Sequence, residues 1–351
     1  MWGWSIVSAS GTGSSLTVGE EVAAARQMQQ LITRSLLVQA IPVACRLGIP
    51  DLLASAARTA EELAEATSAD PGALLRLLRA LTGLDVVTAD GDQFALTSLG
   101  RTLCSGPRSA AASVLFLGSP LVWSAWGALG DAVLDGNAAF RHVHGTGFFD
   151  YLSQHPNELA AFQAFMSAQS RQQIPAVLAA YDFGSAQTIV DVGGGQGALL
   201  AALLTEYRTA RGVLFDRPDV VAHAGPVLGP VASRCEVVSG DFFATVPAGS
   251  DTYVLKLVLH DWDDERAGRI LRNIRGAILP GGRLIIIESV MPPGDEYHHA
   301  KFLDMNMLVL TDGGGERTER EYRTLLEGAK FAFVRVVSTA APVSLVEAIP
   351  V

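Results

Sequence analysis

The chain is poor in cysteine and in charged residues. Its 351 residues include only 3 cysteines, and 18% of them are Asp, Glu, Lys or Arg. Cys45, Cys104 and Cys235 are widely spaced and odd in number, which argues against a disulfide framework and favours a reducing cytoplasm. Every apolar run is broken by a charge or a proline before it reaches about 18 residues, so no membrane span is expected.

Basic residues are also scarce. The 26 Lys and Arg residues are outnumbered by 36 Asp and Glu residues, and the net charge of −10 argues against a nucleic-acid partner. Residues 1–19 contain no basic residue, which excludes a signal peptide, and their Ser, Gly and Thr content predicts a flexible tail. The 49% hydrophobic content fits a chain that buries part of its surface in a subunit interface.

Residues 20–108 have the pattern of a small, mainly helical domain. The apolar positions of residues 20–55 recur at helical spacing, with a kink expected at Pro42. Residues 70–81 form a further predicted helix, with Asp70 as its N-cap.

Residues 85–88 and 93–96 are predicted to form a hairpin joined at Asp90–Gly91. Helix, helix and hairpin together are typical of a winged helix, a fold that often binds DNA. The second helix offers DNA phosphates only Arg76 and Arg79, so DNA binding is not expected.

The second half opens with a glycine-rich turn. Residues 189–192 predict a buried strand, residues 193–197 a turn that contains Gly193 and Gly195, and residues 198–204 a helix. Strand, glycine turn and helix form the first unit of a nucleotide-binding α/β fold, because glycine lets the backbone approach a ligand closely. The spacing also fits a dinucleotide fingerprint, so an NAD-dependent dehydrogenase is an alternative.

Three carboxylates near predicted strand ends indicate the kind of ligand. Asp191 precedes the glycines, and Asp216 follows the second strand, where such folds bind the ribose hydroxyls. Asp241 and Phe242 follow the third strand and suit the amine and the face of an adenine ring. No Lys or Arg cradle for a pyrophosphate accompanies them, which favours a cationic adenosine compound without phosphates, such as S-adenosylmethionine.

A histidine with two glutamates carries the predicted chemistry. His260 follows the apolar segment 251–259, Glu288 ends the strand 283–288, and Glu316 lies in a glycine-rich loop. In an open α/β sheet these strand ends share one edge. A histidine flanked by carboxylates is a general base held in one orientation, and we expect Glu288 and Glu316 to orient the imidazole ring of His260.

These segments together resemble the S-adenosylmethionine-dependent O-methyltransferases typified by plant caffeate O-methyltransferases and bacterial antibiotic-tailoring enzymes. The matching segments are residues 191–197, 215–218, 240–243, 256–264, 280–282 and 315–318. The resemblance implies a Rossmann-like catalytic domain, an N-terminal winged-helix domain that forms a homodimer, and a metal-free reaction that yields S-adenosylhomocysteine. It predicts a tail at 1–19, a dimerisation domain at 20–108, a helical connector at 109–180 and the catalytic domain at 181–351.

The same resemblance assigns further residues. It places Lys256 against the adenosyl group and points to an acceptor site whose predicted residues are Phe162, Met166, Leu257, Asp261, Asn306, Met307 and Thr311. Phe162 and Met166 fit a helix core equally well. Leu257 stands where plant members often have Trp, so a phenolic polyketide or antibiotic intermediate is a better expected acceptor than a phenylpropanoid.

Other functions stay open at this level. N-methylation, or a family member that has changed to hydroxylation or decarboxylation, would need the same cofactor site. A winged-helix regulator that senses a small ligand is a non-enzymatic alternative. His142 and His144 could suggest a metal pair, but no third ligand lies near them in the sequence.

Overall fold

A computed structural model describes residues 17–351 of the chain. Its contacts divide the chain into two compact units that meet between Leu103 and Cys104, and each unit is described by itself. Residues 1–16, most of the predicted tail, lie outside the described residues, whereas Val18 and Gly19 already belong to the first helix. The predicted division into four parts stays a prediction. Within residues 17–351, no helix is long and apolar enough to cross a membrane.

The first unit combines helices with a three-stranded sheet. Its helices are α1 (Val18–Leu37), α2 (Ala40–Arg46), α3 (Ile49–Leu52), α4 (Ala60–Thr67), α5 (Pro71–Thr82) and α6 (Ser98–Arg101). Strands β1 (Arg58–Thr59), β2 (Val87–Asp90) and β3 (Gln93–Leu96) pair antiparallel in the order β1-β3-β2. A hairpin forms as predicted, although Asp90 belongs to its first strand and the connection lies at residues 91–92. The predicted Asp70 N-cap is present, and the Asp70 carboxylate accepts from the Ala73 N–H at 2.7 Å.

Two local predictions in this unit were wrong. The expected continuous helix is interrupted at Val38 and Gln39 instead of at Pro42, because Pro42 lies in the first turn of α2, where its missing N–H costs no helical bond. The first hairpin strand begins at Val87 and not at Asp85, because Asp85 has a φ of +57° and turns the chain out of the preceding helix.

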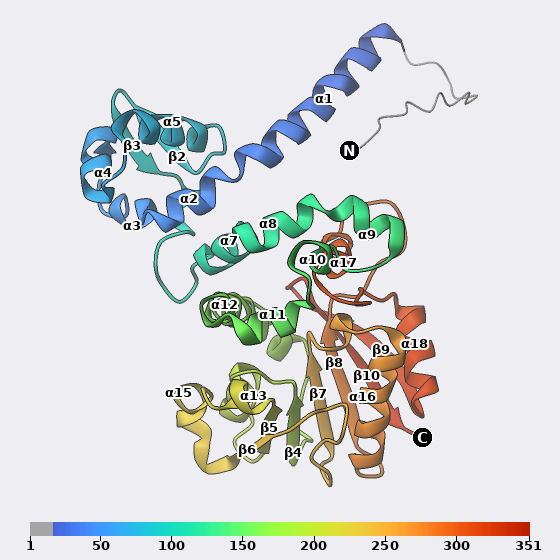
Figure 1. Ribbon diagram of the computed structural model, residues 1–351. Helices are drawn as coiled ribbons and strands as arrows, with labels where there is room; N and C mark the ends of the chain where they lie inside the picture. Colours follow the sequence, from blue (N-terminus) through green and yellow to red (C-terminus); the bar gives the residue numbers. More distant parts are fainter. Residues whose placement is uncertain (1–16) are drawn as a thin grey trace. The chain divides into compact units, whose positions relative to one another are not determined.

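The second unit begins with six helices and continues as an α/β domain (Figure 1). The helices are α7 (Ala111–Leu117), α8 (Pro120–Gly127), α9 (Leu129–Asp135), α10 (Ala139–His144), α11 (Phe148–Gln154) and α12 (Pro156–Ala180). Helices α7 to α11 share an aromatic-rich core with the later helix α17 (His299–Leu310). Phe149 of this group stacks on Trp262 with ring centroids 6.0 Å apart, so α11 lies beside the segment that follows β7.

The sheet has seven strands in the order β6-β5-β4-β7-β8-β10-β9. Strands β4 (Thr188–Val192), β5 (Arg211–Asp216), β6 (Cys235–Ser239), β7 (Thr252–Lys256) and β8 (Arg283–Glu288) run parallel. Strand β10 (Ser344–Pro350) is antiparallel to both β8 and β9 (Phe331–Ser338). From β4 the chain continues to β5 and β6 on one side, and then crosses to β7 on the other side of β4. The strand order therefore reverses between β4 and β7, and open α/β sheets bind ligands at such a point.

Helices cover both faces of this sheet. Alternate residues of β7 show the division, because Tyr253 and Leu255 pack with α16 (Asp264–Ala277) and α18 (Glu319–Gly328), whereas Val254 packs with α12 and α13 (Ala198–Glu206). Short segments α14 (Pro218–Val221), α15 (Gly225–Leu228), η1 (Gly229–Arg234) and η2 (Leu259–Asp261) complete the connections. A sheet buried on both faces leaves the carboxyl edge of its strands as the place for polar side chains.

Candidate functional site

Two glycines of the turn after β4 are required for different reasons: Gly193 for its conformation and its close packing, and Gly195 for its conformation alone. Gly193 and Gly195 have φ angles of +70° and +62°, in the left-handed region that favours glycine. A Cβ on Gly193 would also lie 2.8 Å from a methyl carbon of Val258, so this residue is held by packing. A Cβ on Gly195 would meet nothing within 4 Å. The turn therefore packs against the chain at Gly193 and faces open space at Gly195.

The carboxylate of Asp216 organises this turn. Its Oδ2 accepts a hydrogen bond from the Gly195 N–H at 2.8 Å, and its Oδ1 accepts from the Arg217 N–H at 2.7 Å. Burial raises the pKa of Asp216, and these two backbone donors oppose the rise. The predicted pair of Gly195 and Asp216 is thus brought together at the ends of β4 and β5.

Asp191 at the end of β4 and Lys256 at the end of β7 carry opposite charges that act on each other. Asp191 is 1% exposed, and neither of its carboxylate oxygens makes a hydrogen bond of good geometry within the described residues. Burial raises its pKa to about 7, against the opposing charge of Lys256. Burial also lowers the pKa of Lys256 to about 8, and its ammonium donates to the Ser170 hydroxyl of α12 at 3.2 Å.

Asp241 and Phe242 follow β6 as predicted. The Asp241 Oδ1 accepts from the Phe243 N–H at 2.8 Å, which closes a turn, and Asp241 is exposed. Phe242 is half-buried, and the edge of its ring meets Trp262 at 6.1 Å between centroids. Trp262 therefore links the Asp241–Phe242 turn to the segment that carries His260.

His260 is buried in the turn η2 that follows β7. Its Nδ1 and the Oε1 of Glu316 are 2.7 Å apart, so Nδ1 carries the proton that it donates, and Nε2 lies 3.6 Å from the Oδ1 of Asp261. Burial alone would lower the pKa of His260. The charges of Asp261, Glu316 and Glu288 outweigh it and raise the pKa to about 10.

Glu288 acts on the backbone of this turn and not on the imidazole ring. Its Oε1 accepts from the N–H groups of Val258, Leu259 and His260 at 3.0, 2.6 and 3.3 Å. Its other oxygen accepts a hydrogen bond from the Tyr322 hydroxyl. The expectation that Glu288 orients the ring is therefore corrected: Glu316 holds the ring, and Glu288 holds the main chain.

The predicted acceptor residues fall into different environments. Phe162 belongs to an aromatic cluster, with ring centroids 5.5 Å from Phe116 and 6.2 Å from Phe149. Met166 packs against the core between the sheet and α12–α13, which favours a core role for it. Asp261 lies beside His260 Nε2.

Three further predicted acceptor residues lie on or after α17. The Asn306 side-chain oxygen accepts from the Trp126 indole at 3.3 Å, and Met307 is almost fully buried. The Thr311 hydroxyl donates back to the Met307 carbonyl at 2.9 Å, so it stabilises the end of α17. Leu257, at the end of β7, has a φ of +54°, which is rare for a residue with a branched side chain.

Several residues of the site were missed from the sequence. Trp262 and Arg317 lie inside motifs that were recognised for their neighbours, so their positions carried a usable signal. Phe149 is one of two adjacent phenylalanines and had no motif. Tyr322 is an ordinary buried position on an amphipathic helix, and no sequence pattern marks its hydroxyl.

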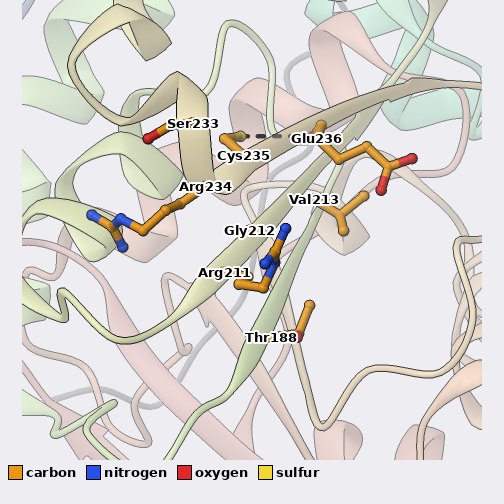
Figure 2. A pocket seen from close by; sticks show the side chains of 8 residues that line it. All are labelled: Thr188, Arg211, Gly212, Val213, Ser233, Arg234, Cys235 and Glu236. Carbon is orange, nitrogen blue, oxygen red and sulfur yellow. Dashed lines mark hydrogen bonds between the residues drawn. The ribbon is translucent and has the colours of Figure 1, made fainter.

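Two cavities lie outside this cluster. The smaller, of about 200 Å³, is at the amino ends of β4, β5 and β6, away from the glycine turn (Figure 2). Its Arg234 donates to the Leu204 and Ala210 carbonyls, and burial raises the pKa of the Cys235 thiol, which disfavours its thiolate form. The larger, of about 570 Å³, is lined by residues of α7, α8, α10, α11 and α12, and Phe116 connects it to the aromatic cluster.

The two histidines considered as metal ligands do not converge. His142 pairs with Asp135 at 3.2 Å, whereas the Nε2 of His144 lies 3.3 Å from the Ser124 hydroxyl. Over residues 17–351 no group of three or more His, Cys, Asp or Glu side chains has the arrangement of a metal site.

Comparison with known proteins sets two of the remaining alternatives aside. Residues 126–332 match the model of the O-methyltransferase domain, and residues 29–106 match the O-methyltransferase dimerisation domain. The chain belongs to the O-methyltransferase family. It is an S-adenosylmethionine-dependent O-methyltransferase, and the dehydrogenase and regulator alternatives are set aside. The glycine turn and its carboxylates belong to a methyltransferase domain.

Individual relatives are similar over nearly the whole chain. The phenazine O-methyltransferase PhzM of Lysobacter antibioticus is 41% identical, covering 92% of this chain and 95% of the relative. The 3-amino-4-hydroxybenzoate 4-O-methyltransferase of Streptomyces cremeus is 40% identical over 88% of this chain and 85% of its own length. The solved structure of CalO1, a methyltransferase of calicheamicin biosynthesis in its SAH-bound form, is 34% identical with a TM-score of 0.84, covering 94% of this chain and 99% of the other.

Proposed function

We propose that this enzyme methylates a phenolic hydroxyl of an aromatic secondary metabolite, such as a polyketide or antibiotic intermediate, with His260 as the general base. The observation that carries the proposal is the buried pair of His260 and Glu316, which leaves Nε2 as the only ring nitrogen that can accept a proton. The aromatic cluster around Phe162, which reaches Trp262 through Phe149, suits a planar acceptor. Relatives named for phenazine and aminohydroxybenzoate methylation support an aromatic acceptor.

The residues at the carboxyl edge of the sheet fit the cofactor. Gly195 faces open space, and Asp191 is a buried carboxylate whose oxygens lack good hydrogen bonds, which suits a ligand that carries positive charge. In this proposal Gly193 and Gly195 lie along the cofactor and Asp216 accepts from its ribose hydroxyls. Asp241 and Phe242 hold the adenine ring, and Lys256 contacts the adenosyl group. When bound, S-adenosylmethionine supplies an electrophilic methyl group on a sulfonium centre.

The role of His260 follows from matching its basicity to that of the acceptor. A phenol has a pKa of about 10, so it is mostly neutral, and a poor nucleophile, at pH 7. The carboxylates around His260 raise the pKa of the imidazole to about 10, which makes proton transfer from phenol to Nε2 nearly balanced in free energy. Glu316 then stabilises the resulting imidazolium through Nδ1. Loss of the proton makes the acceptor oxygen nucleophilic, and the site holds this oxygen in line with the methyl group of the cofactor.

The proposed acceptor wall is narrower than the set predicted from sequence. Phe162, Asp261 and Asn306 stay in it, since each lies in or next to the cluster that reaches Trp262 or His260. Met307 and Leu257 contribute as buried neighbours. Met166 and Thr311 are assigned to packing and to the end of α17 by their contacts.

The N-terminal helices are proposed to form a homodimer interface. Helix α1 has no buried residue in the single chain, and its exposed apolar side chains include Val22, Met28, Leu31, Ile32 and Leu36. Residues 29–106 match a dimerisation domain, which supports this use of the helix. An apolar helical face of this size is covered in most soluble proteins.

An acceptor screen tests the proposed function. Purified enzyme would be incubated with S-adenosylmethionine carrying a labelled methyl group and with a panel of phenazinols, aminohydroxybenzoates and hydroxynaphthoates. Mass spectrometry should show transfer of the label to oxygen in at least one aromatic phenol. Transfer confined to nitrogen acceptors, or to aliphatic alcohols, would overturn the proposed acceptor class while leaving the family assignment intact.

A further inference from the structure

The turn that carries His260 has an unusual entry. The chain leaves β7 through Leu257, whose φ of +54° is strained for a residue with a Cβ, and goes straight into the turn η2. Such a conformation persists only where surrounding contacts hold it. The position of the imidazole therefore depends on what fixes the backbone of residues 257–262.

A buried anion holds the N–H side of this turn. Three successive N–H groups, from Val258 to His260, point at one oxygen of Glu288, which is 0% exposed. Successive N–H groups in such a turn form a concave anion site. The second oxygen of Glu288 accepts from the hydroxyl of Tyr322, also 0% exposed, so α18 fixes the direction of the carboxylate.

A buried cation holds the carbonyl side. The guanidinium of Arg317 donates to the Leu259 carbonyl at 2.9 Å and to the Trp262 carbonyl at 2.7 Å. Its Nε donates to the Asp264 carboxylate at 2.9 Å, at the start of α16. The N–H of Gly315 donates to a third carbonyl of the turn, that of His260, at 2.8 Å. Both ends of the turn thus meet a charge of the sign that its peptide dipoles favour.

We propose that Arg317 and Tyr322 are positioning residues for His260, acting through the backbone of its turn and touching neither acceptor nor cofactor. Glu288, held by Tyr322, accepts hydrogen bonds from the N–H groups of the turn, and Arg317 donates hydrogen bonds to its carbonyls. We call these three side chains the backbone clamp. Because Arg317 directly follows Glu316, one short segment fixes both the ring and the main chain of the base. The inference rests on the proposed role of His260.

The clamp has a measurable consequence for the imidazole. The charged groups that face His260 are Glu316 from the loop after α17, Asp261 from its own turn and Glu288 from β8. Asp304 of α17 lies behind Glu316 and accepts from its N–H at 2.9 Å. If the turn loosens, the 2.7 Å contact between Nδ1 and Glu316 lengthens, and the imidazolium loses part of its stabilisation.

The test uses the full-length enzyme with ¹⁵N-labelled histidine. Tyr322→Phe removes one hydroxyl, and Arg317→Lys keeps the charge but cannot bond two carbonyls and a carboxylate together. Nitrogen chemical shifts of the imidazoles would be followed from pH 6 to 11, with His260 assigned by its absence in His260→Gln. In both variants the pKa of His260 should fall by about 0.5–1 unit, the size expected from a weakened charged hydrogen bond.

Two matched controls lie away from the turn. Tyr253→Phe removes another buried hydroxyl, which donates to the Pro247 carbonyl, and Arg234→Lys alters another guanidinium that donates to backbone carbonyls. Neither should change the pKa of His260. An unchanged pKa in folded Tyr322→Phe would overturn the clamp, and that variant decides the matter if Arg317→Lys does not fold. Turnover of His260→Gln tests the base separately, so the two proposals can fail independently.

Discussion

Replacement of His260 is the most informative perturbation of this enzyme. An ordinary imidazole, with a pKa of about 6.5, would take a proton from a phenol of pKa about 10 at a cost of about 5 kcal/mol. The surrounding carboxylates raise the pKa of His260 to about 10, so the neutral imidazole takes the proton at little cost, but at neutral pH the imidazolium must first lose its own proton. His260→Ala should therefore lower kcat by about 10² to 10⁴-fold on a weakly acidic phenol.

The acceptor's own acidity separates the base from a mere orienting residue. An ortho-nitro analogue of the acceptor found by the screen is already ionised at pH 8 and needs no base. On this analogue His260→Ala should recover much of the lost rate, whereas affinity for S-adenosylmethionine, measured by calorimetry, should stay nearly unchanged. Equal losses on both acceptors would refute general-base catalysis and leave His260 as a residue that only orients the acceptor.

The pH dependence provides an independent check. Because the pKa of His260 is raised, the imidazole is protonated at neutral pH, and only the neutral form can accept a proton. With the weakly acidic phenol, kcat/KM should rise about tenfold per pH unit from pH 6 to 9. With the nitro analogue the reactive pair is imidazolium and phenolate, so the rate should level off above the analogue's own pKa. A plateau above pH 7 with the weakly acidic phenol would contradict the raised pKa.

Three further outcomes follow from the cofactor edge and from α1. Asp216→Ala should weaken binding of S-adenosylmethionine by about 1–3 kcal/mol in calorimetry, since it removes a charged acceptor that also holds the Gly195 N–H. Asp191→Asn should weaken binding and yet raise Tm, more at pH 8 than at pH 4. Because the pKa of Asp191 is raised to about 7, its destabilisation of the fold grows as the pH rises above the ordinary Asp pKa and levels off above about pH 7. Light scattering should show twice the mass of one chain for the wild type, and a smaller particle for Leu31→Glu with Leu36→Glu.

The order of the elements around the cofactor edge was predictable from the sequence. Gly193, Gly195 and Asp216 lie where strand ends and helix starts must meet in a parallel sheet, and the structure brings Gly195 and Asp216 into a hydrogen bond. Hydrophobic runs and glycine turns fix such positions because they act over a few residues. The approach of Glu316 to His260 was predictable only through motifs, since the two residues are far apart in the chain.

What the sequence could not show is the direction of individual side chains. Glu288 was expected beside the imidazole ring, but the left-handed conformation of Leu257 turns three backbone N–H groups toward it first. Nothing in a leucine signals a positive φ. Asp85 moved a strand boundary for the same reason. Tyr322 was missed because the same helical pattern accommodates tyrosine and phenylalanine, and only the neighbouring carboxylate gives its hydroxyl a role.

The distribution of charge in the site assigns different work to each carboxylate around His260. Glu288 accepts hydrogen bonds from backbone N–H groups and from Tyr322, and Glu316 accepts the hydrogen bond from Nδ1 of His260, so both carboxylates are committed before an acceptor arrives. Asp261 alone faces the reactive Nε2, at 3.6 Å, and burial raises its pKa to about 7. Near neutral pH its charge therefore varies with small changes around it. Among the three carboxylates, Asp261 is the one whose charge lies next to Nε2.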